Sequence, residues 1–308
     1  MTGNAVGGSP LVECVPNVSE GRRLDVVQRI VAAARSVAAA HVLDVHSDPD
    51  HNRSVLTMAG PAEAVAEAAH RLAAAAVREI DLAYHRGVHP RIGALDVLPF
   101  VPIAPTSMET CVALAHQVGE RLAAELGIPI YFYGEAALRP ERRVLANVRR
   151  GEYEALCHAI ATDPAAAPDR GPRVMGPAGA TAVGARKVLV AFNVHLRTAD
   201  VRVAQAIARS IRASSGGLPG VQALGLALSS PGVAQVSMNL TDLDRTSIPM
   251  ALAVVRAEAA RHGVEVGDSE LVGLLPAEAA LEAAAGALGL PDLKPRQVIE
   301  LARLDPQL

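Results

Sequence analysis

Aromatic residues are scarce in this chain of 308 residues, which has no Trp, three Phe and four Tyr. Half of the residues are hydrophobic, so the chain can bury a large core, but that core has to be built from Ala, Val, Leu and Ile. A planar ligand would find few rings to stack on. The length predicts one large domain or two smaller ones, at about 100–200 residues per domain.

A surplus of positive charge and long apolar runs are also absent. The net charge is −3, with both signs mixed along the chain, which argues against a nucleic-acid partner. No apolar run reaches the roughly 18 residues of a membrane span, so no membrane partner is expected. The first ten residues, MTGNAVGGSP, lack the basic start and apolar stretch of a signal peptide, and residues 1–10 are predicted to be a disordered tail.

Cysteines are few and odd in number: Cys14, Cys111 and Cys157 are widely spaced and form no CxxC pair. This usage predicts reduced thiols and a cytoplasmic protein.

What the chain does have is an alternation of strand and helix patterns that occurs twice. The first half predicts a strand at 11–16, a helix at 24–38, strands at 42–45 and 54–58, a helix at 61–80, a strand at 95–103, a helix at 107–126 and a strand at 128–133. A Pro- and Ala-rich stretch at 162–180 predicts a linker. The second half predicts a strand at 187–193, a helix at 200–213, strands at 221–228 and 233–240, a helix at 249–262, a strand within 264–275 and a helix at 276–288.

Both halves therefore begin with the order β-α-β-β-α-β, which is that of the ferredoxin-like unit. We predict an α+β fold with two similar ferredoxin-like (βαββαβ) subdomains. The predicted N-terminal subdomain spans residues 11–178, and the C-terminal one spans residues 179–308.

Polar residues that suit chemistry gather in three loops of the first half, at 16–21, 44–53 and 85–96. Loops mounted on a rigid scaffold are frequent sites of chemistry, although polar surface turns have the same composition. His85 and His89 have the spacing of two helical zinc ligands, but Gly87 and Pro90 argue against a helix there. A metal site built from His46, Asp48, His51 and His89 stays an alternative. The run Gly179–Lys187 lacks the ending of a phosphate loop, and no GxSxG elbow is present.

Several runs of the sequence resemble those of glutamate formimidoyltransferases. They occur in order across both halves and are VECVPNVSEG (12–21), HNRSV (51–55), HPRIGALDVLPFVP (89–102), YGEAA (133–137), GATAVGARK (179–187), AFN (191–193), QVSMNL (235–240) and SELVGLLP (269–276). The resemblance extends from about residue 11 to residue 301. It implies that the two similar subdomains face each other across a ligand groove that holds folate, and that the N-terminal one carries the catalytic loop. It further implies transfer of a formimino group from N-formimino-L-glutamate to tetrahydrofolate in histidine degradation and one-carbon metabolism.

The resemblance also implies site residues. The catalytic histidine of the family's HPR motif is His89 here. The folate-contacting segment comprises Gly171, Pro172, Arg173, Val174, Met175, Gly176, Pro177, Ala178 and Gly179, and Arg186 follows it at the expected start of the second half. Tetrahydrofolate is a co-substrate and no metal is expected. A homodimer and a separate cyclodeaminase partner are further implications, since the chain is expected to lack the fused cyclodeaminase domain of some members. His46 stands where animal members have Asp, and the folate segment lacks their Trp.

The chemistry of this reaction explains why such residues would be needed. An amine attacks an amidine carbon and glutamate leaves as an amine, so one proton is removed and one is delivered, which a histidine can do near neutrality. Asp96 or Glu20 could balance the cationic donor. Arg53 and Arg91 could hold the carboxylates of glutamate, unless they form structural salt bridges. Asn17 and Asn52 could bond the amidine. The alternatives are a related folate-dependent formyl transferase, a non-catalytic folate-binding protein and a metal-dependent hydrolase.

Overall fold

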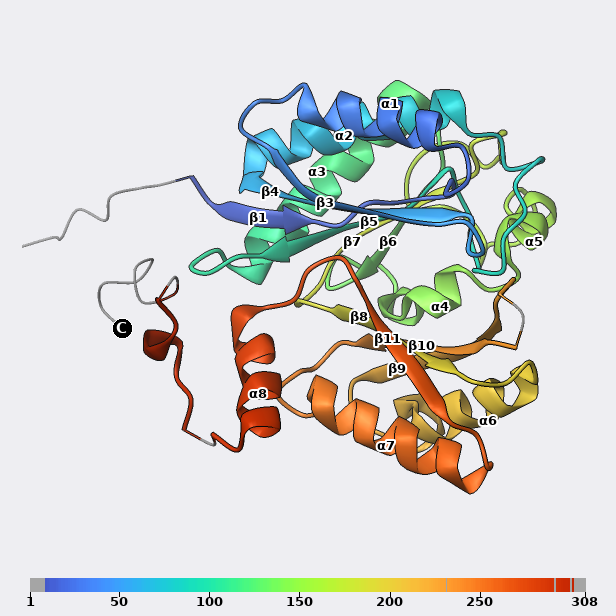
Figure 1. The fold of residues 1–308 in the computed structure, drawn as a ribbon. Helices are drawn as coiled ribbons and strands as arrows, with labels where there is room; N and C mark the ends of the chain where they lie inside the picture. The colour runs from blue at the N-terminus through green and yellow to red at the C-terminus, as the bar shows by residue number, and fades with distance from the viewer. Residues whose placement is uncertain (1–8, 231, 291, 300, 302–308) are drawn as a thin grey trace, which may run out of the picture. The chain divides into compact units, whose positions relative to one another are not determined.

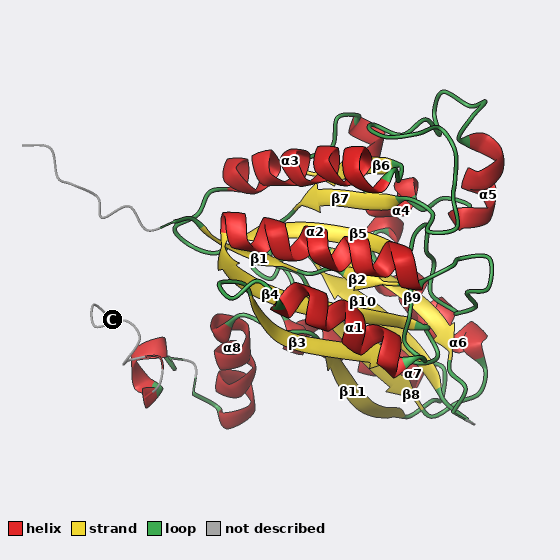
Figure 2. Cartoon of the chain, turned by 90° about the horizontal axis from the view of Figure 1, so that it is seen from above, coloured by secondary structure: helices red, strands yellow, loops and turns green. Residues whose placement is uncertain are grey.

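The computed structural model describes residues 9–230, 232–290, 292–299 and 301, and these form two units that divide between Lys187 and Val188. Each unit combines helices with its own β-sheet (Figures 1 and 2). The predicted mixed α+β class with two domains is therefore confirmed. Most of the predicted tail, residues 1–8, lies outside the described residues.

The sheet of the first unit has seven strands. They are β1 (Leu11–Cys14), β2 (Asn17–Val18), β3 (His41–Asp48), β4 (Arg53–Pro61), β5 (Leu95–Pro102), β6 (Ile130–Gly134) and β7 (Thr181–Ala185). β3 pairs with β4, β4 with β1 and β2, and these two with β5, all antiparallel; β7 then lies parallel between β5 and β6. The central strand β5 is buried almost throughout.

Three helices cover one face of this sheet: α1 (Leu24–Arg35), α2 (Ala62–Glu79) and α3 (Met108–Leu126) (Figure 2). The predicted spacing of apolar residues is confirmed in α1, where Val26, Val27, Ile30, Val31 and Ala34 are all buried. Such a stripe is what an amphipathic helix presents to a core.

The other face of the sheet carries a smaller core with Val97, Tyr131 and Tyr133. The short helices α4 (Leu145–Val148) and α5 (Glu152–Ala159), which were not predicted, contribute Val148 and Leu156 to it. Along β6 the side chains alternate between the two cores, since Ile130 and Phe132 belong to the main one.

The boundary between the two units lies after Lys187, later than the predicted division after residue 178. The cause is β7, which the sequence analysis placed with the second half. Its five residues hydrogen bond between β5 and β6 and so belong to the first sheet. Arg186 accordingly does not begin the first strand of the second unit: its backbone N–H donates to the Phe100 carbonyl, 3.1 Å away, in the first unit.

The second unit has a four-stranded antiparallel sheet. Its elements are β8 (Val190–Leu196), α6 (Val201–Ile211), β9 (Val221–Ala227), β10 (Ala234–Leu240), α7 (Ile248–Arg261), β11 (Val266–Val272) and α8 (Ala277–Leu288). The strand order is β11-β8-β10-β9, and α6 and α7 pack on the core that lines the sheet. Asp200 begins α6 as predicted, because its carboxylate accepts a hydrogen bond from the Arg202 N–H at 3.0 Å.

No helix among the described residues is long and apolar enough to cross a membrane.

Candidate active site

The three polar loops meet at one end of the first sheet because β2 lies between β4 and β5. Asn17 pairs with Val55 of β4 and with Val97 of β5. The residues that follow β2 therefore lie next to the residues that begin β4 and β5. The sheet thus brings together segments that are far apart in the sequence.

Asn52 links all three loops. Its backbone has a positive φ of 48°, a conformation that Asn tolerates better than most residues. Its side-chain oxygen accepts from the Gly21 N–H at 3.0 Å, and its amide nitrogen donates to the Arg86 carbonyl at 3.0 Å. Gly21 and Gly87 permit this close packing, since a Cβ would lie 2.3 Å from the Asp48 carbonyl oxygen and 2.2 Å from that of His51, respectively. Asn52 therefore holds the loops in place.

Asp96 is the centre of the charged cluster and is completely buried. One of its oxygens, Oδ2, accepts hydrogen bonds from Arg53 Nη1 at 2.7 Å and from Arg149 Nη2. The other, Oδ1, accepts from the Ile92 N–H at 2.8 Å. Burial alone would raise the pKa of this carboxyl, but the charges of Arg149 and Arg53 outweigh burial and hold the pKa far below its ordinary value.

Arg53 is buried in the same cluster and binds Asn17 as well as Asp96. Its Nε and Nη2 donate to Asn17 Oδ1 at 3.0 and 2.8 Å. Burial lowers its pKa to about 10, so the guanidinium stays protonated at neutral pH. The cluster therefore combines two cations with one carboxylate and carries a surplus of positive charge.

His89 lies beside this cluster. Its Nδ1 is 2.8 Å from the Pro90 carbonyl oxygen, which can only accept a hydrogen bond, so Nδ1 carries the proton and Nε2 has the lone pair in the neutral ring. Burial, followed by the charges of Arg53 and Arg149, lowers the pKa of this imidazole well below its ordinary value. His89 is therefore neutral near pH 7 and able to accept a proton at Nε2.

His85 and Arg91 have other partners. His85 is buried and its Nε2 lies 2.9 Å from the Asn52 carbonyl oxygen, while Arg91 Nε donates to its Nδ1 at 3.2 Å. The Arg91 guanidinium also binds Glu154 at 2.7 Å and Glu152 at 3.1 Å. In this structure Arg91 joins the 85–96 segment to α5, and its fork is occupied by protein carboxylates.

Glu20 has partners within its own loop. Its Oε1 accepts the N–H groups of Arg22 and Arg23, both at 2.9 Å, at the start of α1. Its Oε2 is 2.5 Å from Arg23 Nε. Although burial would raise the pKa of Glu20, these hydrogen bonds lower it. These contacts make Glu20 part of the turn that precedes α1.

The predicted folate segment, Gly171–Gly179, runs along the 85–96 segment. The Leu82 N–H donates to the Pro177 carbonyl and the Ala94 N–H to the Ala178 carbonyl, both at 2.8 Å, and Gly93 pairs with Gly179. Residues 171–174 are exposed, whereas Gly179 is buried. Arg186 directly follows β7 and lies near Tyr133. Burial raises the pKa of Tyr133, and the positive charge of Arg186 offsets part of that rise.

Two features of the site were not predicted from the sequence. Arg149, which binds Asp96, follows α4, and no local pattern marked it. His51, considered only as a metal ligand, stacks obliquely near His89 with ring centroids 5.5 Å apart. Among the described residues no group of three or more His, Cys, Asp and Glu side chains is arranged to hold a metal ion.

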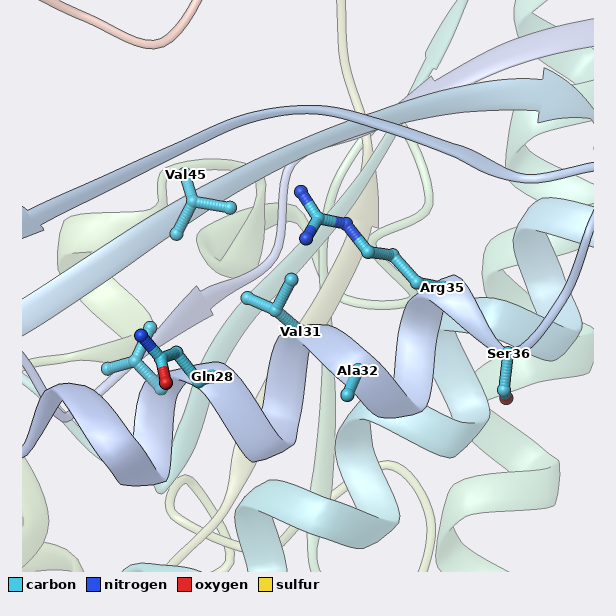
Figure 3. A pocket seen from close by; sticks show the side chains of 7 residues that line it. Gln28, Val31, Ala32, Arg35, Ser36 and Val45 are labelled. Atoms are coloured by element: carbon cyan, nitrogen blue, oxygen red, sulfur yellow. The ribbon is translucent and has the colours of Figure 1, made fainter.

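A surface hollow elsewhere in the first unit shares no residue with this cluster. It is lined by α1 and by Val45 of β3, as Figure 3 shows. Its walls are mostly apolar, with Arg35 as the charged side chain. The convergent polar groups that a reaction needs are absent there, so the charged cluster is the better candidate.

Comparison with known proteins assigns the chain to a family. A model of the N-terminal subdomain of the formiminotransferase domain matches residues 11–186, and a formiminotransferase-domain model matches residues 191–288. The glutamate formimidoyltransferase of Thermoplasma acidophilum is 49% identical over 276 residues, which cover 89% of this chain and 91% of that protein. That of Streptococcus pyogenes is 44% identical over 292 residues, covering 94% and 97%. The formimidoyltransferase-cyclodeaminase of Mus musculus is 43% identical over 284 residues, covering 90% of this chain but 52% of that protein. The chain belongs to the formiminotransferase family.

Proposed function

We propose that this protein is a glutamate formimidoyltransferase that moves the formimino group of N-formimino-L-glutamate to N5 of tetrahydrofolate. The products are L-glutamate and 5-formiminotetrahydrofolate. The observation that carries the proposal is His89, a neutral imidazole with a free Nε2 lone pair beside a cluster of surplus positive charge. Relatives whose names state this activity match nearly the whole chain.

His89 acts as the general base in this proposal. Nε2 accepts the proton that tetrahydrofolate N5 loses as it attacks the amidine carbon, and the Pro90 carbonyl keeps the ring in the required tautomer. Burial, reinforced by the charges of Arg53 and Arg149, lowers the pKa of the imidazole and keeps it unprotonated before the attack. The lowered pKa therefore favours the neutral form of His89, which is the form that can accept the N5 proton.

The charged cluster attracts the donor, which brings two carboxylates. Arg53 and Arg149 together exceed the charge of Asp96, and Arg149 Nε is buried with no hydrogen-bond partner among the described residues. We assign Asn17, Arg53 and Asp96 to the support of this electrostatic site and Asn52 to holding its loops. The contacts of Glu20 and Arg91 favour structural roles for these two residues.

Tetrahydrofolate is the co-substrate and is proposed to contact Gly171–Gly179 and Arg186. The support is that this segment is hydrogen-bonded to the segment that carries His89. We further propose that both units are ferredoxin-like. The order β-α-β-β-α-β from β8 to β11 supports this, as does the same order at the start of the first unit, where the short strand β2 is the one addition.

The cellular setting is proposed from the family resemblance. The enzyme works in the cytoplasm, which suits its free cysteines Cys14, Cys111 and Cys157. It forms a homodimer and hands its product to a separate cyclodeaminase. Light scattering at micromolar concentration tests the dimer, and a monomeric mass would contradict it.

The test of function is a turnover assay with tetrahydrofolate and either formimino-glutamate or formyl-glutamate, run with a chelator present. We expect turnover of the formimino donor and retention of activity in the chelator. Preference for the formyl donor would favour the related formyl transferase. Folate binding without turnover of either donor would favour a binding protein, and activity restored by added zinc would favour metal catalysis.

A further inference from the structure

His51 has a buried side chain with an atom that lacks a partner. Its side chain is 9% exposed, and no hydrogen-bond partner for Nε2 occurs among the described residues. Leaving a buried polar atom unpaired costs about 1–3 kcal/mol, so such an atom calls for an explanation. A role toward a bound molecule is one explanation.

The other nitrogen of the ring faces a carboxylate. Asp48 Oδ2 lies 3.5 Å from His51 Nδ1, while Asp48 Oδ1 accepts the N–H groups of Asp50 and His51 at 2.7 and 2.9 Å. The turn thus fixes Asp48 beside His51 Nδ1. A second proton placed on Nε2 would make an imidazolium whose charge the adjacent carboxylate balances.

His51 and His89 form a pair with opposite surroundings. Their ring centroids are 5.5 Å apart. His89 is anchored by a carbonyl and lies near two arginines, which favours a free lone pair at Nε2. His51 instead has a carboxylate oxygen 3.5 Å from its Nδ1. Two titratable groups in contrasting environments are a frequent basis for acid–base division of labour.

The proposed reaction needs two proton transfers at different nitrogens. N5 of tetrahydrofolate forms a bond to the amidine carbon, the C=N π electrons move to nitrogen, and the N5 proton goes to a base. The bond between that carbon and the glutamate nitrogen then breaks, its electron pair stays on that nitrogen, which takes a proton, and the C=N bond re-forms. No atom or electron is gained or lost overall, since the proton from N5 replaces the one given to glutamate.

We propose that His51 is a second catalytic residue, which delivers a proton from Nε2 to the departing glutamate nitrogen while His89 removes the proton from N5. The proposal rests on the proposed function. After one turnover His89 is protonated and His51 is neutral, and transfer of one proton between them, through solvent, restores the starting state. Asp48 is the positioning residue of this pair.

The turn itself does not need the imidazole. The contact that closes it is the backbone N–H of His51 on Asp48 Oδ1, and the His51 carbonyl oxygen is the atom packed against Gly87. His51→Gln keeps this backbone and removes the acid. His41→Gln is a matched control, because His41 is exposed at the start of β3. Asp48→Asn keeps the acceptor oxygen for the turn and removes the charge.

The experiment compares leaving groups. Each variant is assayed with formimino-glutamate and with the formimino derivative of 5-aminoisophthalate, a dicarboxylate whose weakly basic aryl amine departs without prior protonation. With formimino-glutamate, His51→Gln should lose about 10²–10⁴ in kcat, the usual worth of a general acid, with little change in KM. With the aryl donor the loss should shrink to about tenfold or less. Asp48→Asn should show a smaller loss with the same dependence on the donor, and His41→Gln should match the wild type.

Equal losses with both donors, or a His51→Gln protein with near-normal kcat, would overturn the role of His51. If His51→Gln does not fold, the Asp48→Asn protein decides by the same comparison. Wild-type protein that turns over neither donor would overturn the proposed function and this inference with it.

Discussion

At the scale of single residues, His89 is where the sequence motif and the local geometry agree. The HPR motif suggests the residue, and its Nδ1 contact with Pro90, 2.8 Å away, leaves Nε2 free. His89→Ala should lower kcat by about 10²–10⁴, which corresponds to roughly 3–5.5 kcal/mol of barrier. The fold and the Michaelis constants should change little. Steady-state kinetics of His89→Ala measure kcat and KM, and its unfolding midpoint shows whether the fold is preserved.

His85→Ala is the comparison within the same segment. His85 is buried between the Asn52 carbonyl and Arg91. Its loss should therefore lower the unfolding midpoint clearly, while kcat should fall far less than in His89→Ala. A stable His89→Ala protein with near-normal kcat would remove His89 from the mechanism.

Asp96 should carry a large stability effect. Asp96→Asn leaves Arg53 and Arg149 on a neutral amide in a buried site, which should cost about 3–5 kcal/mol. Since the folded-state pKa of Asp96 is depressed, its stabilisation is complete above the unfolded value of about 3.9 and is lost as pH falls below that. Urea unfolding of the wild type and of Asp96→Asn should show a difference in the free energy of unfolding at pH 7, and this difference should shrink below about pH 4. A difference that is the same at both pH values would contradict this account.

Local sequence could identify some of these residues but not their partners. The polar turn at 47–53, within the loop 44–53, was predictable from its Asp, Pro and Asn content. Arg149, in contrast, lies 53 residues from Asp96. The sequence left Arg91 open between binding substrate and forming a salt bridge, and the structure shows it bound to Glu152 and Glu154. The residues next to an arginine in the sequence do not predict which carboxylate it will pair with in the folded protein.

At the scale of elements, α3 shows packing competing with helix propensity. Ala in place of a mid-helix Gly gains up to about 1 kcal/mol. At Gly119, however, a Cβ would lie 2.5 Å from Phe132 Cε1, in a core whose overpacking costs about 1–3 kcal/mol. Gly119→Ala should therefore lower the free energy of unfolding, as measured by urea titration. A more stable variant would mean that the ring of Phe132 moves aside without cost.

Most predicted helices and strands are confirmed to within a few residues, because apolar residues recur along each of them at the spacing of a helix or a strand. β7 is the instructive miss. Its sequence TAVGA is short, contains Gly and Ala, and follows a Pro-rich stretch, so no strand was predicted there and its residues were assigned to the second half. It is a strand because β5 and β6 lie on either side of it and satisfy its hydrogen bonds.

At the scale of the whole molecule, β7 also sets the limits of the first unit. A fragment of residues 9–187 should fold, because it contains every strand of the first sheet. A fragment of residues 9–178 should not, since β5 and β6 lose the strand that joins them. Thermal unfolding followed by circular dichroism should be cooperative only for the longer fragment. Cooperative unfolding of the shorter one would show that β7 is dispensable.

The sequence by itself determined the type and order of most elements, the three polar loops and the resemblance to a family, because these depend on patterns among near neighbours. Only the tertiary structure decided that β7 belongs to the first sheet, that Arg149 and Arg53 meet on Asp96, and that His51 lies beside His89. Those contacts depend on strand pairing over long separations, and the physical cause is burial: a charged or polar group taken from water has to find its partner wherever the fold brings one.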